Sequence, residues 1–371
     1  MSDRWHEWFA TEAESIRAAG RWREPRDFDA RGPEGTLGGD RVVSFASNDY
    51  LGLTAHPAVM AASIAAIERW GAGSGASRLI VGSRPVHREL EEALAAWRRT
   101  DAALSFPTGF AANVGLLSTL GAPGVRIHSD ALNHASIIDG VRVARANGAE
   151  VRVHPHLDLI ALADALAQPG AQRQIVVTDS VFSMDGDVAP VDDLRRLCER
   201  HDALLVLDEA HAVLEPVPTP GSGVVQVGTL SKTLGALGGY VAADGPLIDL
   251  LVNRARTWIF TTASSPGDAA GALAAIGVLR STEGAALVER LRRLVERVAP
   301  GHRSPIIPIV LGDERAALEA SARLLAAGLF VPAIRPPTVP VGTSRLRIAL
   351  SAAHTDAQVD ALLAALDGLL P

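Results

Sequence analysis

Residues 204–211 read Leu204-Leu205-Val206-Leu207-Asp208-Glu209-Ala210-His211, an aliphatic run that ends in an Asp-x-x-His pattern. Four consecutive aliphatic residues predict a strand buried on both faces, as in a parallel sheet covered by helices. A second apolar run, residues 224–227, ends in Gly228-Thr229-Leu230-Ser231-Lys232. Strands of this kind deliver their carboxyl ends to one edge of the sheet, where open α/β sheets bind ligands. The pattern therefore predicts one crevice that holds Asp208, His211 and Lys232.

Strand-like and helical patterns alternate on both sides of these two runs. Short apolar runs separated by helices predict βαβ units, and hence an α/β fold with a mainly parallel sheet covered on both faces. The seven clearest strand-like runs are Ala103–Phe106, Val125–His128, Val151–His154, Ile175–Thr178, Ala203–Leu207, Val224–Val227 and Gly239–Ala242.

The pattern changes at both ends of the chain. The first ~25 residues predict an amphipathic helix, followed by a Gly/Pro-rich stretch. Beyond residue 265, one long helical region over about 268–298, a later strand over 344–350 and a final helix predict a smaller α+β domain. We therefore divide the chain into an N-terminal helix and arm (1–45), a large domain (46–265) and a C-terminal small domain (266–371).

The composition of the chain is that of an ordinary globular protein. It has 371 residues, of which 48% are hydrophobic and 21% charged, and a formal net charge of −7. A negative chain has no overall attraction to nucleic acid or anionic membranes, so local arginines must hold any anionic substrate. The single cysteine, Cys198, allows no intramolecular disulfide, which suits a reducing compartment. With a polar start and no apolar stretch of about 20 residues, we expect a cytoplasmic enzyme without nucleic-acid or membrane partners.

Each residue of the predicted crevice has a common structural explanation when it is taken alone. Asp208 could cap a helix, His211 could be an ordinary buried histidine, and Lys232 could be a solvated surface charge. Lys232, however, lies in a loop of small residues, 228–235, that carries no other charge. Desolvation there would lower the pKa of its amine and make it a better nucleophile. A lysine that forms an imine, with a carboxylate that pairs with a protonated pyridine nitrogen, is what pyridoxal phosphate requires of its protein.

Three further segments are candidates for completing such a site. Residues 108–113 open a helix whose first amides could grip a phosphate, or they form an ordinary strand-to-helix turn. His134 could stack on a planar ring or simply begin a helix. Ser183, in the turn 181–187, could reach the phenolic oxygen of the cofactor, although turn chemistry explains its Asp-Gly-Asp sequence equally well.

From about Ser44 to its end, the chain resembles the α-oxoamine synthase family of fold-type-I pyridoxal-phosphate enzymes. The motifs that carry the resemblance are Ser47–Leu53 (SNDYLGL), Gly73–Arg78 (GSGASR), Gly109–Asn113 (GFAAN), His134–Ser136 (HAS), Val181–Asp187 (VFSMDGD), Asp208–His211 (DEAH) and the Lys232 loop. The tail, Ala333–Arg347, resembles the oxononanoate-synthase branch more closely than the glycine, serine or succinyl-CoA branches.

The resemblance implies a role for each matching residue and no metal. Lys232 would bind the cofactor covalently and move the α-proton, while Asp208 would keep the pyridine nitrogen protonated. The other implied contacts are His211 and Ser183 on the phenolic oxygen, His134 on the ring, Gly109, Phe110 and Thr229 on the cofactor and its phosphate, Arg347 on the amino-acid carboxylate, and Asn48, Ser351 and Arg23 (or alternatively Arg21) on the substrates. Thr261 or Thr262 would reach the phosphate of a neighbouring subunit, which implies a homodimer.

The implied reaction is the decarboxylative condensation of L-alanine with a pimeloyl thioester, carried by coenzyme A or by acyl carrier protein, to give 8-amino-7-oxononanoate. Alternatives are another synthase of the family, such as glycine C-acetyltransferase, and a non-catalytic subunit, which the presence of Lys232 argues against. A nucleotide-binding protein would need a Gly-x-Gly-x-x-Gly or P-loop pattern, and neither is found. One departure from the family is the segment between His211 and Lys232, which lacks the usual longer glycine-rich stretch and leaves the thioester partner open.

Overall fold

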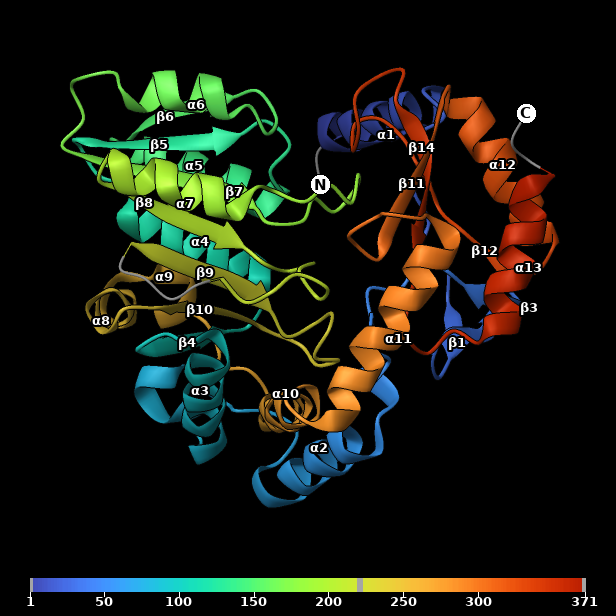
Figure 1. The fold of residues 1–371 in the computed structure, drawn as a ribbon, viewed down its shortest axis with the longest axis horizontal. Helices are drawn as coiled ribbons and strands as arrows, with labels where there is room; N and C mark the ends of the chain where they lie inside the picture. The colour runs from blue at the N-terminus through green and yellow to red at the C-terminus, as the bar shows by residue number, and fades with distance from the viewer. Residues whose placement is uncertain (1–2, 219–222, 369–371) are drawn as a thin grey trace.

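A seven-stranded sheet forms the centre of the larger of two lobes in the computed structural model, which describes residues 3–218 and 223–368 (Figure 1). Six of its seven strands point the same way, and β10, which lies between β4 and β9, is antiparallel to both of these neighbours. The strand order is β4 (Ala102–Phe106), β10 (Gly239–Ala243), β9 (Val224–Thr229), β8 (Ala203–Asp208), β7 (Arg173–Asp179), β5 (Val125–Asp130) and β6 (Glu150–His154). The predicted α/β fold with a mainly parallel seven-stranded sheet is confirmed, and all seven predicted runs lie in its strands.

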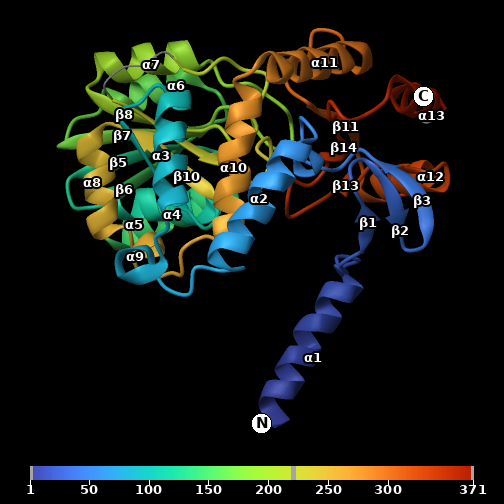
Figure 2. The same cartoon turned by 90° about the horizontal axis from the view of Figure 1, so that it is seen from below.

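Helices cover both faces of this sheet because successive strand residues point to opposite sides. On β8, Leu205 and Leu207 pack into one apolar cluster, and Val206 packs into another. Burying each of these side chains stabilises the fold by roughly 1.5–3 kcal/mol. One face carries α4 (Gly109–Leu120), α5 (Ala135–Ala146), α8 (Gly245–Arg254) and α9 (Arg256–Ile259). The other carries α6 (Leu159–Leu166) and α7 (Val191–Arg200), with α2 (Pro57–Trp70), α3 (Pro85–Arg98) and α10 (Pro266–Leu279) packed together beside β4 and β10 (Figure 2).

The smaller lobe contains two further sheets. In one, β14 (Ser344–Ala349) lies between β11 (Ile306–Gly312) and β13 (Ala333–Ile334). The other joins the N-terminal arm to the C-terminal part, because β3 pairs in parallel with β12. Its strands are β1 (Phe28–Ala30), β2 (Glu34–Leu37), β3 (Asp40–Ser44) and β12 (Leu329–Phe330). The remaining elements of this lobe are α11 (Thr282–Val298), α12 (Glu314–Ala326) and α13 (Asp356–Asp367), and short turns η1 (Leu53–Ala55) and η2 (Arg78–Gly82) lie in the large lobe.

The long helical region expected over 268–298 is instead two helices, α10 and α11, bent by 80° at residues 280–281. The break falls at Ser281, whose hydroxyl accepts a hydrogen bond from the Gly284 amide and so caps a new helix. No helix among the described residues is long and apolar enough by itself to cross a bilayer, although this bent pair meets the length and composition test when taken together.

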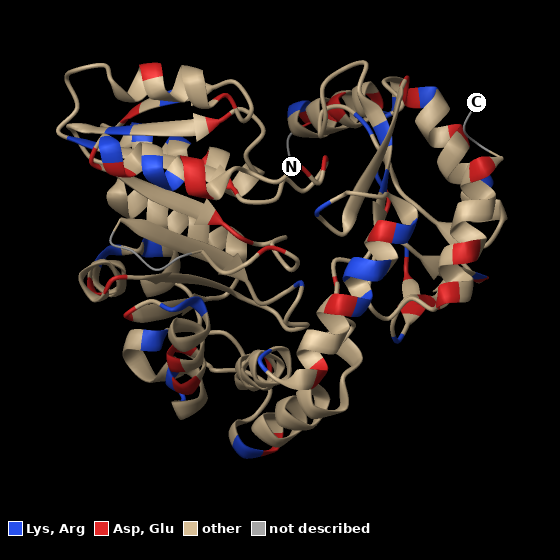
Figure 3. Ribbon diagram, in the orientation of Figure 1, with Lys and Arg blue, Asp and Glu red and all other residues tan. Residues whose placement is uncertain are grey.

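The N-terminal helix α1 (Asp3–Ala18) is shorter than the ~25 residues expected and extends away from both lobes (Figure 2). None of its residues is buried, and Trp5, Trp8 and Phe9 are about half exposed. Charged residues are spread over the helices, whereas β8 and β9 carry none except at the end of β8 (Figure 3). That end of the sheet leads to the predicted crevice.

Candidate active site

The carboxyl ends of β8 and β9 bring Asp208, His211 and Lys232 into one place. Asp208 is the last residue of β8, and His211 lies in the turn that follows. Lys232 lies in the loop after β9, and its Nζ is 2.7 Å from Nε2 of His211. Asp208 and His211 are both buried. Lys232, which is 21 positions from His211 in the sequence, therefore joins His211 and Asp208 in a compact group at the edge predicted from the strand pattern.

Lys232 is the only lysine in the sequence, since every other basic side chain of the Lys/Arg class is arginine. Burial lowers the pKa of its amine to about 8, although the nearby Asp208 and Asp179 carboxylates act to raise it. A pKa in this range leaves a useful fraction of neutral amine near neutral pH, which is the form that attacks carbonyl groups.

Asp208 is held by groups on two elements. The Asn113 side-chain amide, on α4, donates to its Oδ2 at 2.6 Å, and the Ala210 backbone N–H donates to its Oδ1 at 3.0 Å. The same Asn113 amide also donates to the Ser136 hydroxyl on α5 at 2.9 Å. Hydrogen bonds to a buried carboxylate fix its orientation and stabilise its charge. The residues of the GFAAN motif thus support Asp208 as well as opening a helix.

Asp179 is a second buried carboxylate beside Asp208. It ends β7 and lies opposite Asp208 in the strand register. Burial, and then the charge of Asp208, raise the pKa of Asp179 well above its ordinary value. Its Oδ2 accepts the backbone N–H of His134 at 2.8 Å. Asp179 therefore positions the start of α5, where His134 lies.

His134 begins α5, and its Nδ1 lies 2.7 Å from the Ser136 hydroxyl. Burial lowers the pKa of His134, and the Lys232 charge lowers it further, against the raising effect of Asp208. The imidazole is therefore neutral at physiological pH. A neutral, exposed ring next to the Asp208–Lys232 pair can cover a planar group without adding a positive charge.

The N-terminus of α4 points to the same end of the sheet. Thr108 caps it by accepting the Ala111 amide at 3.0 Å, and the amides of Gly109 and Phe110 belong to the first turn, which has no intrahelical acceptors. A Cβ on Gly109 would lie 3.4 Å from Cβ of Thr229, so this turn lies against the end of β9. The first turn of a helix, with its dipole, is a natural site for an anion.

Arg347, on β14, brings the small lobe to the crevice. It is buried, its Nε donates to the Ser183 carbonyl at 2.5 Å, and its Nη2 donates to Oδ1 of Asn48 at 3.1 Å. Its charge contributes to lowering the pKa of His211, for which burial is the largest cause. The planar guanidinium is suited to a carboxylate, and Arg347 is placed where a carboxylate would lie close to His211.

Comparison with known proteins places this arrangement in a family. The model of the aminotransferase class I and II family matches residues 40–366. The chain belongs to that family. An 8-amino-7-oxononanoate synthase of Anaeromyxobacter dehalogenans is 48% identical to it, with 98% of this chain and 96% of the relative covered. One from Bordetella petrii is 46% identical, with 91% and 90% covered.

Solved structures agree with this assignment to the class I and II aminotransferases. A serine palmitoyltransferase of Sphingomonas wittichii superposes with a TM-score of 0.86 at 31% identity and covers 97% of this chain and 96% of its own. An 8-amino-7-oxononanoate synthase of Francisella tularensis has a TM-score of 0.71 at 24% identity, with 88% and 96% covered, and supports the fold alone. The fold is thus that of fold-type-I pyridoxal-phosphate transferases, as expected.

Several predicted site residues of this family member lie outside the Lys232 group. The Ser351 hydroxyl donates to the Asp49 carbonyl at 2.6 Å, and Ser183 offers its carbonyl to Arg347. Thr261 and Thr262 lie in the loop between α9 and α10, and no hydrogen bond among the described residues joins them to the Lys232 group.

The arm that contains Arg21 and Arg23 runs along the small lobe. Arg23 is exposed, and Arg21 is 3.5 Å from Glu314. A groove of about 570 Å³ beside the arm is lined by Arg26, Arg335 and Ser47, the neighbour of Asn48, among other residues. The arm and the Asn48 segment therefore share a groove next to the crevice.

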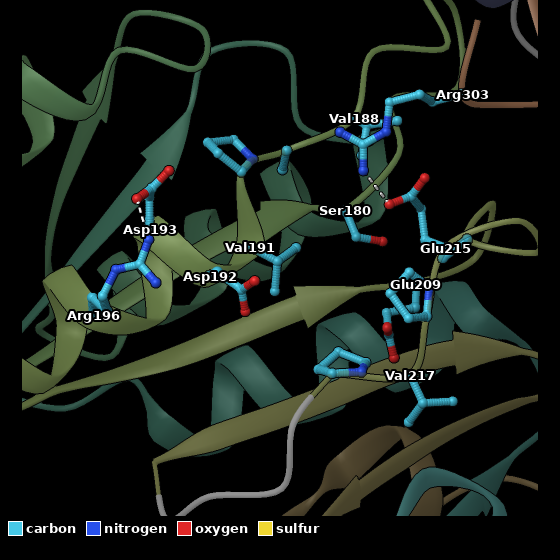
Figure 4. A pocket seen from close by; sticks show the side chains of 15 residues that line it. Ser180, Val188, Val191, Asp192, Asp193, Arg196, Glu209, Glu215, Val217 and Arg303 are labelled. Carbon is cyan, nitrogen blue, oxygen red and sulfur yellow. Dashed lines mark hydrogen bonds and ion pairs between the residues drawn. The ribbon is translucent and has the colours of Figure 1, made fainter. Parts of the chain in front are cut away.

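The short segment after His211 borders a cavity of about 450 Å³ (Figure 4). Arg303 and Glu215 both line it and form an ion pair with 2.5 Å between Nη2 and Oε2. The pair is joined by a dashed line in Figure 4. The Arg292 side chain also donates to the Leu214 carbonyl at 3.1 Å. Two arginines of the small lobe therefore hold residues 214–215, whereas residues 219–222 of this segment lie outside the described residues.

Three residues of the site were not assigned a role from the sequence. Asn113 and Tyr50 lie within quoted motifs, and Tyr50 Oη is 2.5 Å from Nδ1 of His211. Asp179 follows the apolar run 175–178, so its place at a strand end was a usable signal. Asn113 contacts Asp208, 95 positions away, and Tyr50 contacts His211, 161 positions away. Contacts between residues so far apart cannot be predicted from a local sequence pattern.

Proposed function

We propose that this chain is a pyridoxal-phosphate-dependent acyltransferase that condenses L-alanine with a pimeloyl thioester to give 8-amino-7-oxononanoate, CO₂ and a free thiol, in biotin biosynthesis. The observation that carries the proposal is the single lysine, with a lowered pKa, facing His211 and grouped with Asp208. It occurs in a chain 48% identical over nearly its whole length to a synthase named for that product.

The residues of the crevice fit pyridoxal phosphate. Lys232 offers an amine of pKa about 8 for an imine bond, and Asp208 offers an oriented, buried carboxylate for the pyridine nitrogen. The first turn of α4, with Gly109 and Phe110, offers amides to a phosphate. When bound, the cofactor supplies the delocalisation that makes the Cα–H of an amino acid acidic. The protein contributes the position of the reacting groups and the electrostatic environment around them.

The side chains of this protein perform the remaining tasks. Arg347 holds the amino-acid carboxylate beside Asn48, which orients the Cα–H toward Lys232. Lys232 then accepts the α-proton and later returns one, because an amine of pKa about 8 can work in both directions near neutral pH. His134 stays neutral against the ring, and His211, also neutral, holds the Lys232 amine in place.

We place the acyl thioester in the groove beside the N-terminal arm. The groove adjoins Ser47 and contains the cationic side chains of Arg26 and Arg335. Arg21 and Arg23 lie on the same arm and are the candidates for contact with the acyl substrate. Cations on this path suit a thioester carried by coenzyme A or by acyl carrier protein, both of which are anionic.

We also propose a homodimer in which each subunit lends Thr261 or Thr262 to the phosphate of its neighbour. Next to this loop, Ile80 and Val81 of η2 are 74% and 69% exposed, and Phe260 is 69% exposed. Neighbouring exposed apolar side chains of this kind mark protein–protein interfaces. A cytoplasmic location is in keeping with the single cysteine, Cys198, which is buried.

The dimer has a direct test. Subunits carrying Lys232→Ala are mixed with subunits carrying both Thr261→Ala and Thr262→Ala, after partial unfolding and reassembly. If a threonine acts across the interface, mixed dimers contain one complete site and activity returns. If mixing restores nothing although mixed dimers form, the threonines do not act in trans.

The reaction is tested by incubating the purified protein with L-alanine and either pimeloyl-coenzyme A or pimeloyl acyl carrier protein. We expect CO₂ release and a product with the mass of 8-amino-7-oxononanoate, and neither with Lys232→Ala. Turnover of glycine with acetyl-coenzyme A, but not of L-alanine, would assign the chain to the glycine C-acetyltransferases instead. Full activity of Lys232→Ala would refute the assignment of the lysine.

A further inference from the structure

A continuous row of hydrogen bonds joins the carboxylate-binding arginine to the lysine. Arg347 Nη2 lies 3.1 Å from Oδ1 of Asn48, and the same oxygen lies 3.0 Å from Oη of Tyr50. Tyr50 Oη lies 2.5 Å from Nδ1 of His211, and His211 Nε2 lies 2.7 Å from Nζ of Lys232. The residues come from both lobes, because Arg347 is on β14 and His211 follows β8.

The chemistry of the groups fixes the direction of each hydrogen bond. A guanidinium only donates, so the Asn48 atom that faces Arg347 must be the amide oxygen, which only accepts. Tyr50, 3.0 Å from that oxygen, must donate its one proton to it. The Tyr50 oxygen is then left with lone pairs toward His211, whose Nδ1 must carry a hydrogen.

His211 must be neutral for this order of bonds to leave an acceptor facing Lys232. It is fully buried, and burial together with the charges of Lys232 and Arg347 lowers its pKa well below the ordinary value. A neutral imidazole has one N–H and one lone pair. With the hydrogen on Nδ1, the lone pair lies on Nε2, toward Lys232.

We propose that Tyr50 is a positioning residue that transmits the hydrogen-bond direction set by Arg347 and Asn48 to His211, and so holds His211 with its Nε2 lone pair facing Lys232. Tyr50 is completely buried, and burial raises the pKa of its phenol, so it remains a proton donor across the physiological range. We call this row of hydrogen bonds, from Arg347 to Lys232, the relay. At one end, the Nε2 lone pair of His211 stabilises the charged form of Lys232, and at the other end Arg347 is the site of the amino-acid carboxylate.

The relay gives amino-acid binding a route to the lysine. A carboxylate that binds Arg347 Nη2 competes with Asn48 Oδ1 for the same N–H donor. When Asn48 loses this hydrogen bond, the directions of the bonds from Asn48 to Tyr50 and from Tyr50 to His211 are no longer fixed. This inference rests on the proposed function only for the nature of the ligand at Arg347. The row of hydrogen bonds stands without it.

Because Lys232 is the only lysine, the relay can be tested by NMR on the full chain in its cofactor-free form, labelled with ¹³C-lysine. The pKa of the single side chain is read from its Cε shift. We expect Tyr50→Phe to lower this pKa by roughly half to one pH unit, because Nδ1–H loses its buried acceptor and His211 turns its hydrogen to Nε2. The opposite order of bonds, with Tyr50 donating to His211, predicts a rise instead.

Two further variants separate the relay from simple packing. Asn48→Leu keeps the contact between Tyr50 and His211 but removes the acceptor that orders it, and we expect the same fall in the Lys232 pKa. Tyr240→Phe removes the hydroxyl of the only other tyrosine, which is also buried and lies outside the row, and should leave the pKa unchanged.

A rise or no change of the pKa in Tyr50→Phe overturns the proposal, and so does a fall in Tyr50→Phe that Asn48→Leu does not reproduce. If Tyr50→Phe does not fold, Asn48→Leu decides alone. ¹⁵N shifts of labelled histidine provide an independent readout of which His211 nitrogen carries the hydrogen. Since no cofactor or substrate is present, failure here leaves the proposed reaction standing.

Discussion

Lys232 Nζ and His211 Nε2 face each other at 2.7 Å in a site where both groups are shifted toward neutrality. Burial is the main cause in each case, lowering the lysine pKa to about 8 and the histidine pKa well below its ordinary value. The Asp208 and Asp179 carboxylates oppose the shift at the lysine. The balance leaves an amine that changes its protonation state within the physiological range.

The reactivity of Lys232 should therefore follow a pKa of about 8 rather than the usual value of about 10.4. Below pH 8 most of the amine is protonated and reacts slowly, so labelling of the cofactor-free protein by an acylating reagent should rise as the pH passes through 8. Mass spectrometry of the peptide that contains Lys232 measures this without interference from other lysines. The unfolded protein serves as the control, and an identical profile in both states would contradict the shift.

Asn113→Ala should weaken the site through Asp208. The change removes the amide that donates to the buried Oδ2 at 2.6 Å, and a hydrogen bond to a charged group contributes about 1.5–3 kcal/mol. We expect a loss of turnover of roughly 10- to 100-fold and weaker retention of pyridoxal phosphate on dialysis. Asn147→Ala, which removes an exposed amide bonded to the Ser118 carbonyl, is the matched control. Equal effects of the two changes would rule out the role of Asn113.

Arg347→Lys should raise the KM for L-alanine far more than the KM for the acyl donor. Lysine keeps the charge but loses the planar pair of donors that a carboxylate requires. Removing such a pairing costs about 2–5 kcal/mol, so the increase should be at least about 30-fold. Arg345→Lys is the control on the same strand, because Arg345 pairs with Asp185 and should affect stability instead. A parallel rise of both KM values would show that Arg347 acts on the fold and not on the amino acid.

The fold could be predicted because its signals are local. The run 203–207 is aliphatic and ends in Asp208, so both the strand and the direction in which it delivers the carboxylate follow from the sequence. The same is true of the run 224–227 and Lys232. The bend at Ser281 was missed because Ala- and Leu-rich sequence on both sides continues the helical period, and only a capping side chain ends it.

The contacts that complete the site were beyond local patterns. Asn113 reaches Asp208 only because α4 packs against β9 and β10 beside the end of β8, and Tyr50 reaches His211 only because the segment before η1 lies beside the turn after β8. Asp179 could have been found, since it ends a strand next to Asp208 in the sheet, but the strand order must be known first. Resemblance to family motifs indicates which residues contact the cofactor and substrates, but it does not indicate which residues of the protein contact one another.

The two ion pairs around the short segment should differ greatly in their contribution to stability. Arg98 and Glu209 are both nearly fully buried, and Arg98 also donates to Gln226 at 2.6 Å. Arg98→Ala leaves the Glu209 charge buried without its partner, which typically costs about 3–5 kcal/mol. Arg303 is 63% exposed, so Arg303→Ala should change the free energy of unfolding by less than about 1 kcal/mol.

Urea unfolding of both variants measures this contrast. Because Glu209 directly follows Asp208, Arg98→Ala should also lower activity, whereas Arg303→Ala should not alter the KM for L-alanine. Arg98→Met, which keeps most of the buried volume, separates the loss of charge from the loss of packing. If Arg98→Met paired with Glu209→Gln restores stability but not activity, the ion pair orients the end of β8 in addition to holding it. Equal costs for Arg98→Ala and Arg303→Ala would mean that Glu209 finds water or another donor when its partner is removed.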